Sequence, residues 1–66
     1  MGRSTRMFEI IQILRASGRP VTAEQLSDRL EVSPRTIYRD IAALQSMRTP
    51  VEGAAGLGYI LRQSYD

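Results

Sequence analysis

Two arginines, Arg35 and Arg39, lie four residues apart near the middle of the chain, with Thr36 and Tyr38 between them. A guanidinium group forms paired hydrogen bonds to a guanine edge or to a phosphate, and hydroxyl groups also contact phosphates and bases. Either arginine could read a guanine edge, and Thr36 could contact a thymine methyl group or a phosphate. These residue types at this spacing therefore indicate DNA recognition in a major groove.

The sequence offers little for catalysis or for metal binding. It contains no histidine and no cysteine, which removes the commonest general base and every thiolate nucleophile or ligand. None of its nine basic residues is lysine, and its seven acidic residues show no paired-carboxylate or metal-ligand spacing. We therefore expect no enzyme activity, no cofactor and no metal site.

The two arginines are expected on a recognition helix that spans about residues 34–48. Ser33 is a good N-cap, and Pro34 suits the first helical position. At about 100° per residue, Arg35 and Arg39 lie opposite an apolar face that can dock on a core. Arg39, in the middle of the outer face, is expected to be the more damaging arginine to lose. The alternative is an ordinary amphipathic helix with solvated arginines. The apolar face comprises Ile37, Ile41, Leu44 and Met47.

A first helix is expected to begin from a cap at Ser4 or Thr5, with residues 1–4 frayed, and to end near Ser17. Gly18 then suits the left-handed position that ends many helices. Apolar residues at helical spacing give this helix a core-facing side. That side comprises Met7, Phe8, Ile10, Ile11, Ile13 and Leu14.

A second helix is predicted from Ala23, because Thr22 and Gln25 have capping-box spacing. Only the three residues 31–33 separate it from the recognition helix, and this arrangement is typical of a helix-turn-helix. Thr22, at the start of the second helix, could hold a DNA phosphate. Arg6 could reach the DNA backbone from the start of the first helix.

After the recognition helix the apolar period changes from 3.6 to 2, which predicts a β-hairpin. Residues 49–52 and 59–62 form its strands around a glycine-rich loop, and Tyr59 points inward. Val21 is expected in a short edge strand. The predicted fold is therefore mostly α with a small β-hairpin: a winged helix-turn-helix of three helices plus a wing.

The 66 residues form one small domain, residues 1–66, in which residues 63–66 begin a linker. The net charge of +2 is too small to identify a nucleic-acid binder by itself. No apolar run approaches a membrane span and no signal-peptide pattern opens the chain. A soluble, cytoplasmic protein without a membrane partner is the expectation.

The sequence resembles the helix-turn-helix of bacterial WYL-domain transcription regulators. The likeness lies in residues 26–30 followed by residues 32–41, in the wing segments 50–53 and 56–61, and in residues 7–11 of the first helix. It implies a winged helix that binds double-stranded DNA and is joined to a C-terminal ligand-sensing and dimerising domain, which we expect to be absent here. Deoxyribose-operon-type repressors and the biotin-operon repressor have related winged helices.

The chain departs from that family at two places. Members often have glycine where this chain has Arg48, so Arg48 is predicted to adopt a positive φ at the end of the recognition helix. Many members carry an arginine near the wing tip, where this chain has Ala54 and Ala55. The wing is therefore expected to contact phosphate only through backbone N–H groups.

Two functions are compatible with this pattern. The first is sequence-specific DNA binding through Arg35, Thr36, Tyr38 and Arg39, by a domain that is a monomer or weak dimer in isolation. The alternative is a winged helix that binds a partner protein, because two arginines beside a tyrosine also suit an interface hot spot. Salt distinguishes them, since DNA binding weakens steeply as the salt concentration rises.

Overall fold

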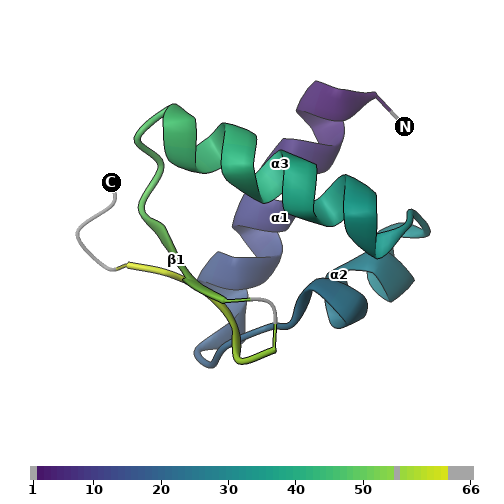
Figure 1. Cartoon of the computed structure of the whole chain (residues 1–66). Helices are drawn as coiled ribbons and strands as arrows, with labels where there is room; N and C mark the ends of the chain where they lie inside the picture. The colour runs from purple at the N-terminus through teal and green to yellow at the C-terminus, as the bar shows by residue number, and fades with distance from the viewer. Residues whose placement is uncertain (1, 55, 63–66) are drawn as a thin grey trace.

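Three helices and an antiparallel hairpin make up the fold, and the predicted winged helix-turn-helix class is confirmed. The computed structural model describes residues 2–54 and 56–62, so the predicted linker and the wing-tip residue Ala55 lie outside the described residues. In Figure 1, α3 passes across α1, and the hairpin lies by the C-terminal end of α1. The elements are α1 (Arg3–Ser17), α2 (Ala23–Leu30), α3 (Pro34–Ser46), β1 (Val51–Ala54) and β2 (Gly58–Leu61).

The caps predicted for α2 and α3 are both present. The Ser33 hydroxyl accepts a hydrogen bond from the Thr36 backbone N–H at 3.2 Å, and proline follows it at the first helical position. At the start of α2, the Thr22 hydroxyl accepts from the Gln25 N–H at 3.1 Å, and the Gln25 side chain accepts from the Thr22 N–H at 2.9 Å. Local sequence therefore sets where both helices of the helix-turn-helix begin.

The start of α1 differs from the prediction. The helix begins at Arg3, so residues 3 and 4 are helical rather than frayed, and the cap predicted at Ser4 or Thr5 is wrong. Gly2 takes the N-cap position in an extended conformation without a side-chain hydrogen bond. Its carbonyl accepts from the Arg6 N–H at 2.9 Å, which closes the first helical turn. The Arg6 side chain also anchors this turn on α3.

One hydrophobic core joins all the elements, but two predicted members are exposed. Phe8 is 60% exposed because it lies about 200° around α1 from the buried Ile10. Met47 is 64% exposed because α3 ends at Ser46, so helical spacing no longer places it on the core face. The core comprises Ile10, Ile13, Leu14, Val21, Ala23, Leu26, Ile37, Ile41, Leu44, Val51 and Tyr59.

Two residues other than glycine end α2 and α3 in the left-handed conformation. Arg48, with φ 63°, confirms the prediction for the end of α3. Its N–H donates to Gln45 and the Thr49 N–H donates to Leu44, both at 3.0 Å, which is the Schellman arrangement. Glu31, with φ 58°, plays the same part in the turn after α2, and sequence reasoning did not foresee it.

Tyr59 ties the wing to the segment between α1 and α2. β1 and β2 pair in register from Val51 opposite Leu61 to Ala54 opposite Gly58. The Tyr59 N–H donates to the Val21 carbonyl at 2.7 Å, and the Val21 N–H donates back at 2.9 Å. The predicted edge strand at Val21 is therefore a single bridging residue. Tyr59 is 7% exposed, which confirms that it points inward.

Gly58 is required where the wing meets the loop before α2. Its φ is 99°, and a Cβ there would lie 2.8 Å from the Cβ of Pro20. A larger residue would therefore be strained and would also push the hairpin away from the loop.

Candidate nucleic-acid interface

The outer face of α3 presents two guanidinium groups. Ile37, Ile41 and Leu44 are buried in the core, whereas Arg35 and Arg39 are exposed on the opposite side. Within the described residues, neither arginine side chain forms an ion pair or a hydrogen bond with the protein. Exposed guanidinium groups without protein acceptors are available to an external phosphate or base edge.

Tyr38 is also exposed on α3. Its side chain is 42% exposed. The pKa of Tyr59 is raised above its ordinary value, first because burial disfavours the phenolate and second because of the charge on Tyr38. Tyr38 therefore offers an exposed phenol group on the same helix as Arg35 and Arg39.

The opposite edge of α3 is tied to α1 by an ion pair. Asp40 is 2% exposed, and its carboxylate accepts hydrogen bonds from Nε and Nη2 of Arg6, the latter at 3.1 Å. These bonds raise the pKa of Arg6 from its ordinary value, because the carboxylate stabilises the charged guanidinium. The sequence suggested Arg6 for the DNA backbone, but here its guanidinium is engaged inside the protein.

Sequence reasoning missed Asp40, although a signal was present. Asp40 falls three residues after Ile37 and four before Leu44, which is the spacing of the apolar face. A carboxylate at such a position is costly to bury unless a cation pairs with it. The pattern therefore predicts a cationic partner for Asp40, and Arg6 of α1 is that partner.

Thr36 and Thr22 both serve the backbone around them. Thr36 is half-buried, and its hydroxyl lies 3.1 Å from that of Ser33. The Thr22 hydroxyl is occupied by the α2 cap, and Glu24 places a carboxylate in the first turn of the same helix. The phosphate contact suggested for Thr22 stays a prediction.

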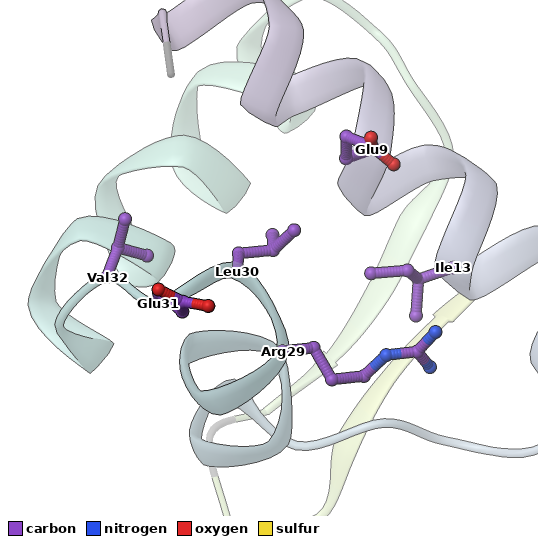
Figure 2. Close-up of a pocket in the computed structure, with 6 residues that line it drawn as sticks. All are labelled: Glu9, Ile13, Arg29, Leu30, Glu31 and Val32. Carbon is purple, nitrogen blue, oxygen red and sulfur yellow. The ribbon is translucent and has the colours of Figure 1, made fainter.

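A hollow lies away from these residues, between α1 and α2 (Figure 2). It has a volume of about 570 Å³. Two carboxylates and one guanidinium surround it, and this charge balance does not favour phosphate. Its lining residues are Glu9, Ile13, Arg29, Leu30, Glu31 and Val32.

The described residues carry neither a cluster of metal ligands nor a helix that could span a membrane. No three histidine, cysteine, aspartate or glutamate side chains are grouped there as ligands for a metal ion. None of the helices described here has both the length and the apolar character needed to cross a membrane.

Residues 6–60 match the family model described as "HTH domain", and the chain belongs to this helix-turn-helix family. The chain is also similar to a protein of Thermotoga maritima named "Probable transcription repressor NiaR". The two are 39% identical over 59 residues, which cover 89% of this chain and 33% of the relative. The chain thus spans about one third of the length of the relative that it matches.

Proposed function

We propose that this chain is the DNA-reading domain of a bacterial transcription regulator, with α3 in the major groove of double-stranded DNA. The observation that carries the proposal is the outer face of α3, where Arg35 and Arg39 are exposed and have no protein acceptor among the described residues. The core packing of the other face sets the helix in one orientation. The family and the relative named as a repressor support the same function.

Each exposed residue of α3 has a role in this proposal. Arg35 and Arg39 are the candidates for a guanine edge and for the adjacent phosphates. Tyr38 contacts the backbone strand on the wing side, and the wing adds backbone N–H groups. Thr36 lines the opposite side of the helix.

The proposal includes a larger protein. Two thirds of the Thermotoga relative lie outside the matched region. The resemblance to WYL-domain regulators supports a C-terminal domain that senses a ligand and dimerises. A cytoplasmic location follows from the proposed access to DNA.

Selection from a random duplex library, followed by titration of the selected duplex, tests the proposal. We expect a defined binding sequence and an affinity that falls steeply with salt. Arg35→Ala should weaken binding to that sequence by ~1–3 kcal/mol and relax the preference at one base pair. Binding that is equal for all sequences would contradict specific readout. Absence of DNA binding, with salt-insensitive capture of a protein partner, would favour the protein-interaction alternative.

A further inference from the structure

A hollow of about 250 Å³ lies where the start of α1 meets α3, and positive groups dominate its lining. Arg3 and Arg6 reach it from the first two turns of α1, and Arg39 comes from the outer face of α3. Thr36 and Asp40 complete the lining. Two segments thirty residues apart in the sequence therefore build one polar site.

The Arg6–Asp40 pair makes this hollow suitable for an anion. Arg6 donates to both oxygens of Asp40, so the only carboxylate in the lining is already neutralised. Arg3 and Arg39 are exposed and have no acceptor among residues 2–54 and 56–62. Two guanidinium charges thus remain uncompensated at the hollow.

We infer that Arg3 and Arg39 together hold one backbone phosphate of the bound DNA in this hollow. The inference rests on the proposed function and deepens it. A phosphate has the charge and the oxygen acceptors that two guanidinium groups can share. Arg6 does not touch the phosphate; it is a positioning residue that fixes the start of α1 against α3 and cancels the charge of Asp40.

The position of the hollow favours a phosphate over a base. It lies where Thr36 and Asp40 of α3 meet the start of α1, and its lining includes Arg39 but not Arg35. When a recognition helix lies in a major groove, its edges face the two phosphate strands. Arg39 therefore anchors the helix to one strand, and the guanine edge is left to Arg35.

Methylphosphonate scanning of the selected duplex tests this assignment. Each phosphate is replaced in turn by the uncharged analogue, and binding is titrated with the wild type, Arg3→Gln and Arg39→Gln. On unmodified DNA, each variant should bind several-fold more weakly, almost uniformly across sequences, and with a smaller salt slope. At one phosphate position, neutralisation should weaken the wild type but produce no further loss in either variant.

Arg29→Gln is the matched control, because it removes one exposed arginine at the hollow between α1 and α2. It should bind like the wild type. Circular dichroism melting checks each variant's fold, and Arg3→Lys, which keeps the charge, should recover part of the affinity. Wild-type affinity in Arg3→Gln, or different sensitive phosphates for Arg3 and Arg39, would overturn the shared site alone. Failure of the wild type to bind any duplex would overturn the proposed function as well.

Discussion

At the scale of single residues, the Arg6–Asp40 pair is a buried polar link between α1 and α3. A buried carboxylate is tolerated because the guanidinium satisfies both of its oxygens. The sequence suggested that Arg6 could reach the DNA backbone from the start of the first helix. Its partner is 34 residues away, and only the crossing of two helices brings them together.

Removing the charge of Asp40 should destabilise the domain. Asp40→Asn leaves the Arg6 guanidinium, whose side chain is only 14% exposed, without its counter-charge, and we expect a loss of roughly 1–3 kcal/mol. The double variant Arg6→Met/Asp40→Leu should recover most of this loss, because apolar pairs often replace buried ion pairs well. Urea unfolding measures both. Equal stability of wild type and Asp40→Asn would show that the pair contributes nothing.

Tyr59 is expected to be structural and to give the domain a sensitivity to high pH. Its pKa is raised in the folded state, so its stabilising contribution is complete below the unfolded value of about 10 and is lost as the pH rises through the folded value. Tyr59→Phe removes this ionisation and should therefore lose less stability above about pH 10. The pKa of Arg6 is raised further above its already high ordinary value, so its titration does not interfere in this pH range.

At neutral pH, Tyr59→Phe should bind DNA like the wild type. The Tyr59 ring is buried, but its hydroxyl has no hydrogen-bond partner among the described residues and is not itself buried. DNA titration, combined with urea unfolding at two pH values, separates a structural role of Tyr59 from a direct role in DNA binding. Loss of DNA affinity with unchanged stability would instead mean that Tyr59 stacks on the DNA.

At the scale of elements, short sequence patterns predicted the features that depend only on neighbouring residues. The caps at Thr22 and Ser33 and the left-handed Arg48 each depend on a few neighbouring residues, and all three were predictable. Phe8 was mispredicted because apolar character alone does not tell which side of α1 meets the core. The left-handed Glu31 was missed because the sequence has no glycine there, although the three-residue turn needs a positive φ.

The backbone strain at Arg48 should lower the free energy of unfolding by a measurable amount. Left-handed backbone costs a residue other than glycine roughly 1 kcal/mol, so Arg48→Gly should stabilise the domain by about that amount. For a domain of this size, the melting temperature should rise by about 4–8 °C. Arg48→Ala is the control, because it removes the same side chain without relieving the backbone. A gain in Arg48→Ala equal to that in Arg48→Gly would assign the effect to the side chain.

At the scale of the whole molecule, the fold class followed from the sequence, but the shape of the interface did not. Periodicity placed Arg35 and Arg39 on one face of a helix, and the structure has them there. It could not show that Arg3 and Arg39 line the same hollow, because that depends on how α1 crosses α3.

The domain by itself should bind DNA weakly and be a monomer or a weak dimer. One recognition helix and a wing without charge at Ala54 give a footprint of order 600–1,000 Å², as for a single module. Regulators of this architecture gain affinity when two helices meet half-sites on the same duplex, and a tether or dimer supplies the high effective concentration. We therefore expect a dissociation constant of about micromolar or weaker, as for binding dominated by phosphate contacts.

Sedimentation together with DNA titration at two salt concentrations checks this expectation. Each phosphate neutralised contributes about 0.9 to the slope of log affinity against log salt concentration, so the slope counts the phosphates held. A fused tandem of two domains should bind a duplex with two half-sites far more tightly than one domain binds either half, with about twice the slope. Tight, salt-insensitive binding by a monomer would mean that base contacts supply the affinity. Phosphate contacts and the pairing of two domains would then contribute little.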